Sequence, residues 1–131
     1  MSIFNNHSAE ILILLFFVLT YFFSVIEKVA DWKGTIAYYK NHFRDSIFNS
    51  KVPLLLAIVL LFEIVVLVLL STGSYYLIVE NSPFIAKIGL EVSAITLLLF
   101  LIGQRVAKDY PGATSITVYF ILNTIGLYLL G

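Results

Sequence analysis

Three ionisable residues interrupt apolar runs of the chain and are the strongest candidates for chemistry: Glu63, Lys87 and Glu91. A charge inside hydrocarbon is costly and usually marks a functional site or a buried ion pair. Lys87 and Glu91 are four residues apart, so on a helix they share one face and are expected to pair. Glu63 is then left without a cation, and we expect it to hold a proton.

One further polar residue, Asn123, is expected at the same depth, and a tyrosine lies one turn from it. Counted from the basic ends of their runs at the helical rise, Glu63, Glu91 and Asn123 lie about 16, 18 and 15 Å deep. Tyr119 is four residues from Asn123, on the same face. The spacing therefore predicts a ligand or proton site that comprises Glu63, Lys87, Glu91, Asn123 and Tyr119. A purely structural role stays open, because polar side chains also join helices in lipid, usually by less than about 2 kcal/mol each.

Four apolar runs must position these side chains, over residues 9–28, 52–72, 83–104 and 112–130. Each is long enough to cross about 30 Å of hydrocarbon as a helix, and none alternates as a strand would. The chain is 60% hydrophobic and only 12% charged, which excludes an ordinary soluble domain. No basic stretch precedes the first run, so we expect a retained helix rather than a cleaved signal peptide. The expected fold is all-α: one polytopic domain over residues 1–131, with four transmembrane helices in a bundle.

The basic residues predict an orientation. All but one of the 8 Lys and Arg residues lie within residues 28–51 or residues 104–112. By the positive-inside bias, residues 28–51 and 104–112 are cytoplasmic and both termini lie on the periplasmic side of an inner membrane. Residues 71–83 are expected to form the outer connection between the second and third runs.

The connection between the first two runs has aromatic residues at helical spacing, with lysines among them. This pattern is typical of an amphipathic helix that lies in the headgroup region. An anchor is the simplest role, and a docking surface for a cytoplasmic partner is the alternative. The carboxylates at positions 27 and 31 share a face and could hold a cation or a quinone headgroup, although a solvated helix end is the simpler interpretation. The residues expected at this interface are Glu27, Lys28, Asp31, Trp32, Tyr39 and Phe43.

Several kinds of chemistry are excluded by composition and motifs. The net charge of +0 gives no reason to expect nucleic acid as a partner. The absence of cysteine excludes disulfide exchange, thiolate zinc sites and ordinary iron–sulfur clusters. Catalytic triads, phosphate-binding glycine loops and two-His-plus-carboxylate metal sites are not found in the sequence. We therefore predict no catalytic residue, no metal site and no cofactor held by the chain alone, so a redox role would need an external quinone or a partner's cofactor.

The first connection and the second run together resemble the DoxX-like family of small bacterial membrane proteins. The resemblance rests on the segments SVIEKVADWKGTIAYYKNHF and PLLLAIVLLFEIVVLVLLSTG. The family pattern has a lysine after the first helix, an aromatic connection and a glutamate in the second helix, which correspond here to Lys28, residues 32–43 and Glu63. Family members commonly have glycines around that glutamate, where this chain has residues 64–66, Ile-Val-Val. The resemblance implies four spans and links the chain with thiosulfate:quinone oxidoreduction and with membrane redox complexes.

Three functions follow from these patterns. We expect a non-catalytic accessory or structural subunit of a larger membrane complex, in respiration or another redox process. The first alternative is a quinone-linked oxidoreductase component, with Glu63, Glu91 and Asn123 around the quinone headgroup and Glu63 handling protons. The second is a small proton-coupled carrier that oligomerises. The expected partners are the lipid bilayer and other membrane subunits or further copies of the chain.

Overall fold

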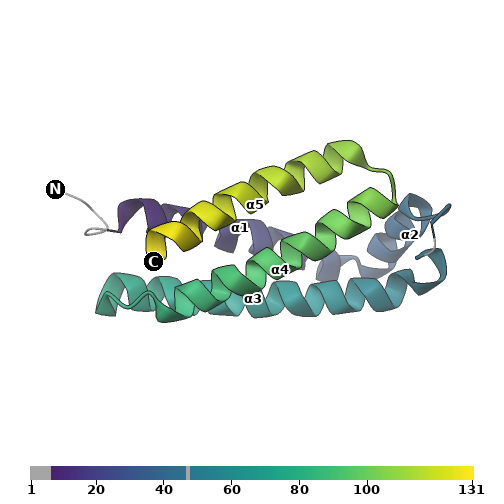
Figure 1. The fold of residues 1–131 in the computed structure, drawn as a ribbon. Helices are drawn as coiled ribbons and strands as arrows, with labels where there is room; N and C mark the ends of the chain where they lie inside the picture. Colours follow the sequence, from purple (N-terminus) through teal and green to yellow (C-terminus); the bar gives the residue numbers. More distant parts are fainter. Residues whose placement is uncertain (1–6, 47) are drawn as a thin grey trace.

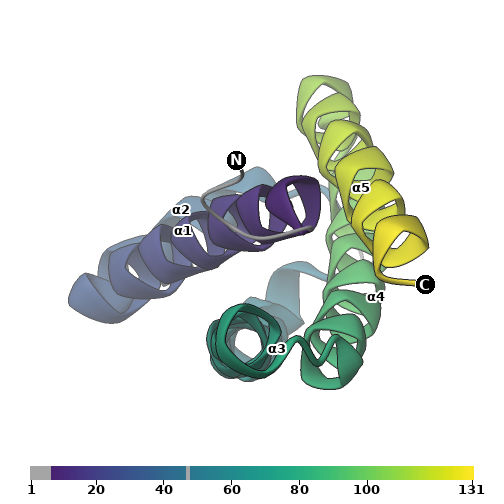
Figure 2. The same ribbon diagram turned by 90° about the vertical axis from the view of Figure 1, so that its left-hand side faces the viewer.

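The computed structural model describes residues 7–46 and 48–131, which are helical apart from short connections. Four long helices lie side by side: α1 (Ser8–Ala30), α3 (Val52–Glu80), α4 (Phe84–Val106) and α5 (Tyr110–Leu130) (Figure 1). Both α1 and α4 contact α3 and α5, so the four helices form a ring (Figure 2). Each is long and apolar enough to cross a membrane, which confirms the predicted multi-pass helical fold.

The connection between α1 and α3 contains the short helix α2 (Trp32–His42) and a single 3-10 turn, η1 (Asn49–Lys51). Asp31 starts α2, because its side chain accepts a hydrogen bond from the Gly34 N–H at 3.1 Å. Asp109 starts α5 in the same way, accepting from the Gly112 N–H at 3.0 Å. These caps allow sharp turns, so α2 folds back beside α3 at one end of the bundle.

Helix α3 is longer than the sequence predicted. It has 29 residues and ends at Glu80, before Asn81 in the left-handed conformation, so most of the expected outer connection is helical. Tertiary packing explains the extra turns, because Leu77 is fully buried. The backbones of α3 and α4 also touch here: a Cβ added at Gly73 would lie 2.5 Å from the Cα of Ala86. Small residues at such contacts stabilise helix pairs in membranes, and this outweighs the turn preference of serine and glycine.

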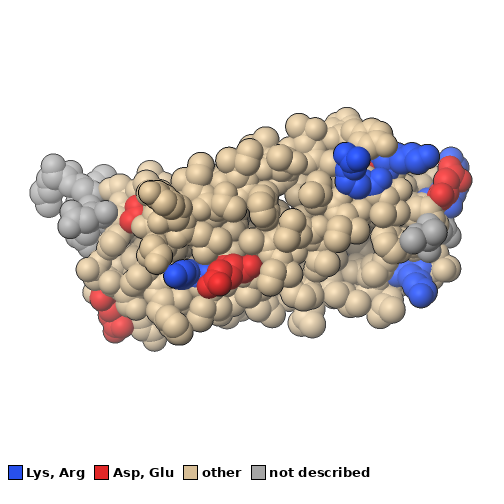
Figure 3. Space-filling model, in the orientation of Figure 1, with Lys and Arg blue, Asp and Glu red and all other residues tan. Residues whose placement is uncertain are grey.

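The two ends of the bundle differ. At the end where α1 begins and α5 ends, here called the terminal half, Gly89 and Gly126 also allow close contacts, with Leu70 and Leu90. Toward the other end, the α2 half, α1 and α5 diverge (Figure 2). Most Lys and Arg side chains gather at the α2 end (Figure 3). The polar candidates of the sequence are therefore divided between a closely packed half and a more open one.

Candidate functional site

A buried ion pair joins α1 to α3 in the α2 half. The ammonium Nζ of Lys28 lies 2.9 Å from Oε1 of Glu63, and it donates a hydrogen bond to Oγ of Ser24 at 2.6 Å. Glu63 is 0% exposed and Lys28 is 9% exposed. Lys28 was expected at the headgroup interface, and its burial inside the bundle gives Glu63 the cation that it was predicted to lack. The argument for a proton on Glu63 therefore no longer applies.

The hydrogen-bonding capacity of Glu63 is not used up by this pair. Neither of its carboxylate oxygens accepts a well-directed hydrogen bond from the described residues. Oε1 has the nearby charge of Lys28, whereas Oε2 has neither an ion-pair nor a hydrogen-bond partner among these residues. A buried acceptor without a donor costs about 1–3 kcal/mol, and more when it is charged. Oδ1 of Asn123 is also buried without a donor among the described residues, but it belongs to an uncharged amide, so the carboxylate oxygen of Glu63 is the costlier of the two.

Glu63 lines a cavity of about 190 Å³, which we call the Glu63 cavity. All five α-helices contribute to its wall. Tyr21 is fixed there by a hydrogen bond of 2.8 Å between its hydroxyl and Oγ of Ser93 on α4. The complete wall combines aromatic, aliphatic and polar side chains: Phe17, Thr20, Tyr21, Ser24, Lys28, Tyr39, Glu63, Leu97, Phe100, Gln104, Ile116 and Tyr119.

Helix α2 covers the cavity through Tyr39. Burial raises the pKa of the Tyr39 hydroxyl, and the nearby Tyr38 and Glu63 raise it further. The hydroxyl therefore stays protonated at neutral pH and remains available as a hydrogen-bond donor.

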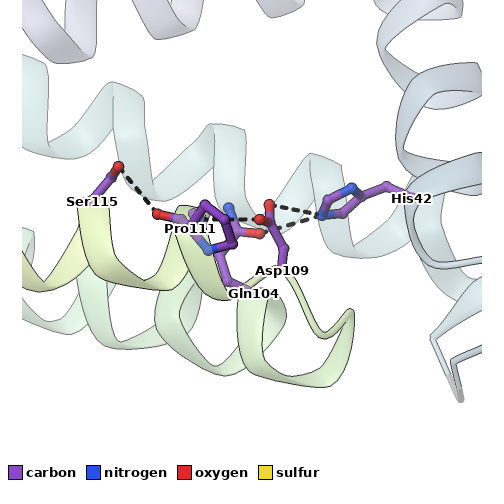
Figure 4. Close-up of polar contacts among 6 residues, drawn as sticks. His42, Gln104, Asp109, Pro111 and Ser115 are labelled. Carbon is purple, nitrogen blue, oxygen red and sulfur yellow. Dashed lines mark hydrogen bonds and ion pairs between the residues drawn. The ribbon is translucent and has the colours of Figure 1, made fainter.

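A second polar cluster holds α2 in this position. Nε2 of His42 lies 3.3 Å from Oε1 of Gln104 and 3.4 Å from Oδ2 of Asp109 (Figure 4). Gln104 also belongs to the wall of the Glu63 cavity. The cluster therefore connects α2 to the end of α4, to the start of α5 and to the cavity itself.

The predicted convergence of five polar residues is wrong. Glu63 and Tyr119 line the cavity, but Glu91 is exposed on the outer surface of α4. Lys87 is half-buried, and its Nζ donates to the backbone carbonyl of Gly131 at 3.2 Å. Asn123 is buried and donates from Nδ2 to the carbonyl of Leu90 at 2.9 Å, which joins α5 to α4. The directions in which these side chains point around their helices were not predicted.

The remaining candidates for the headgroup interface lie where α1 ends and α2 begins or ends. Glu27 and Asp31 are exposed, and Asp31 caps α2. Trp32 and Phe43 are half-buried. Within residues 7–46 and 48–131, no group of three His, Cys, Asp or Glu side chains is placed to hold a metal ion.

Lys28 and Gln104 are the site residues that sequence reasoning missed. The signal for Lys28 was present in the sequence: Phe17, Tyr21, Ser24 and Lys28 recur at spacings of four, three and four residues, which places them on one helix face. That face ends in a serine and a lysine rather than in aliphatic residues, so it indicated a polar inner surface on α1. No comparable periodicity pointed to Gln104, because its role depends on the turn between α4 and α5.

The arrangement can receive and orient a small polar group. The ammonium and the phenol can donate to carbonyl oxygens, and the carboxylate can accept from a hydroxyl. Comparisons of the chain with known protein families, with curated proteins and with solved structures find no match.

Proposed function

We propose that the chain is a DoxX-like, non-catalytic subunit of a larger membrane redox complex, and that it binds a quinone headgroup in the Glu63 cavity. One observation carries the binding proposal. Glu63 is fully buried and paired with Lys28, yet its Oε2 has no partner and the side chain forms part of a cavity wall. A structural ion pair alone would gain nothing from leaving this oxygen unsatisfied.

A quinone matches the chemistry of the cavity in both redox states. Its carbonyl oxygens accept hydrogen bonds, which Lys28 and Tyr39 can donate. After reduction its hydroxyl groups donate, and Oε2 of Glu63 can accept. The ring can lie against Phe17 and Phe100, which belong to the same wall.

The redox role divides between this chain and a partner. Reduction of a quinone to a quinol takes up two electrons and two protons, and the electrons would come from a cofactor of the partner subunit. The two protons would come from the partner as well, because the carboxylate of Glu63 is paired with Lys28 and acts here as a hydrogen-bond acceptor. The resemblance to the DoxX-like family supports the membership in a complex, and the geometry of the cavity supports the ligand.

The proposal includes an orientation in a bacterial inner membrane. The α2 end, where most of the basic residues gather, faces the cytoplasm, and the end with both termini faces the periplasm. A headgroup in the Glu63 cavity would then lie in the cytoplasmic half of the bilayer.

The test is binding of decylubiquinone to the purified protein in mild detergent. Binding is measured as quenching of the fluorescence of Trp32, the chain's single tryptophan. We expect Glu63→Gln and Lys28→Gln to weaken binding at least tenfold. The matched controls are Glu91→Gln and Lys87→Gln, which make the same chemical changes outside the cavity and should bind as the unmodified chain does. Equal affinity of all five proteins, or no binding by any, would contradict the proposal.

Membership in a complex is tested separately. We expect a mild-detergent pull-down from native membranes to recover larger membrane subunits in fixed stoichiometry with the chain. Recovery of the chain alone would remove the accessory-subunit part of the proposal and would leave the binding part untouched.

A further inference from the structure

A second cavity lies beside the Glu63 cavity and differs from it in character. Its volume is about 210 Å³, and we call it the α3–α4 groove. Its wall is made mainly of aliphatic and aromatic side chains of α3, α4 and the connection between α2 and α3, with the residues Phe43, Phe48, Val52, Leu55, Val59 and Ile102 among them.

The groove and the Glu63 cavity adjoin each other. Lys28, Tyr39, Phe100 and Gln104 belong to the walls of both. Three of them, Lys28, Tyr39 and Gln104, provide the polar side chains of the groove, so its polar end is the end that meets the Glu63 cavity. The rest of the groove leads away from the ion pair along apolar residues.

The groove also reaches the outer surface of the bundle. Ile58 on α3 and Ile102 on α4 belong to its wall and are 41% and 54% exposed. Both helices are apolar membrane spans, so this surface faces lipid. An apolar groove that reaches the lipid-facing surface thus adjoins a polar cavity inside the protein.

We propose that the α3–α4 groove holds the hydrocarbon tail of the ligand whose headgroup lies in the Glu63 cavity, and that the ligand reaches the site sideways from the bilayer. This inference rests on the proposed function. A tailed quinone can place its headgroup beside Lys28 and Glu63 only if its tail has an apolar path out. Lipid is as apolar as the groove, so the groove adds little affinity through the hydrophobic effect and acts by giving the tail this path.

The experiment fills the groove from its two sides. Val59→Phe adds a ring from α3. Gly103→Leu adds a side chain from α4, where a Cβ would have only ordinary contact, 3.6 Å from the ring of Phe43. Val68→Phe, on the exposed surface of α3 and outside both cavities, is the matched control. Each protein is titrated with decylubiquinone and with the same headgroup lacking its decyl chain.

We expect both groove variants to weaken binding of the tailed quinone at least tenfold and to change binding of the tail-less quinone by less than about twofold. Unchanged binding of both ligands in both variants would overturn the groove inference, because any lipid chain in the groove would then be unrelated to the ligand. The proposed function would not be affected by this result. Equal weakening of both ligands would also overturn it, because the substitutions would then act on the headgroup or on the fold. Failure of the tail-less quinone to bind the unmodified chain, or to respond to Glu63→Gln, would instead contradict the proposed function.

Discussion

The terminal half and the α2 half of the bundle contain the same helices but are built differently. In the terminal half, Gly73 brings the α3 backbone against Ala86, and Asn123 joins α5 to α4 through the carbonyl of Leu90. In the α2 half, α1 and α5 diverge, and the space is lined by aromatic and charged side chains. Small residues thus close one half, and large polar and aromatic residues keep the other half from closing.

The difference indicates that one half holds the helices together and the other half contains the candidate site. Helix association in lipid depends on close packing and interhelical hydrogen bonds, because lipid gives no hydrophobic drive between helices. The terminal half provides that association. The α2 half can then maintain a buried ion pair and two cavities without having to hold the bundle together.

The largest effect is expected at the ion pair. Lys28→Met leaves the Glu63 carboxylate buried without a cation and should lower the free energy of unfolding by about 3 kcal/mol. The double variant Lys28→Met with Glu63→Leu removes both charges and should recover to within about 1 kcal/mol of the unmodified chain, while losing quinone binding. The measurement is unfolding in mixed micelles of mild detergent and SDS. A double variant as unstable as the single one would show that the α2 half needs the pair for its own stability.

The next effect compares two glycines on the facing helices α3 and α4. Gly73→Ala places a methyl group 2.5 Å from the Ala86 backbone, so the helices must move apart, at a cost of about 2 kcal/mol. Gly103→Ala in the α2 half meets only ordinary contacts and should be neutral or stabilise by up to about 1 kcal/mol, since alanine favours helix. The same micelle assay measures both, and equal effects would contradict the proposed difference between the halves.

A smaller effect is expected at Asn123. Replacement by alanine removes the hydrogen bond from Nδ2 to the Leu90 carbonyl and should cost about 1 kcal/mol, as typical for such bonds in membranes. Thr124→Ala is the control, because the Thr124 hydroxyl bonds only to the carbonyl of Ile121 on its own helix. Quinone binding should be unchanged in both variants. A loss of binding with Asn123→Ala would mean that the two halves are coupled.

The smallest effect is a pH dependence at the terminal end. A hydrogen bond with Glu10 raises the pKa of His7 above its ordinary 6.5, and a second bond, with Asn81, raises it further. Since the folded pKa is the higher one, the stabilisation is fully present below pH 6.5 and is lost as the pH rises through the folded value. The SDS fraction at the midpoint of unfolding should therefore fall slightly as the pH rises from 6.5 through the pKa of folded His7. In His7→Gln this fall should disappear, and its persistence would assign the pH dependence to another group.

The sequence allowed the helices to be predicted better than their contacts. Continuous apolar runs identify membrane spans because length and composition suffice for that inference. The aromatic residues at helical spacing after residue 31 likewise indicated α2. The extent of α3 beyond residue 72 could not be predicted, since it depends on packing between Gly73 and Ala86, which are distant enough in the chain to leave no local signal.

The candidate site was predicted only in part, because contacts between helices leave no local signal in the sequence. Glu63 was found because a carboxylate in an apolar run is conspicuous whatever surrounds it. Its partner was missed, because Lys87 was paired with Glu91 by spacing and Lys28 was placed at the headgroup interface. Lys28 lies near the end of a run, where lysines usually extend to the headgroups, so only its shared face with Tyr21 and Ser24 could have revealed its burial.

The length of α3 has a consequence for the surrounding membrane. With 29 residues it measures about 44 Å, roughly 14 Å more than the hydrocarbon layer of a typical bilayer. Such an excess is accommodated by tilting the helix or by local thickening of the lipid, at a cost of fractions of a kcal/mol per Å. The thickness of the host bilayer should therefore affect the tilt of α3. Lipids with longer chains should collect around this helix.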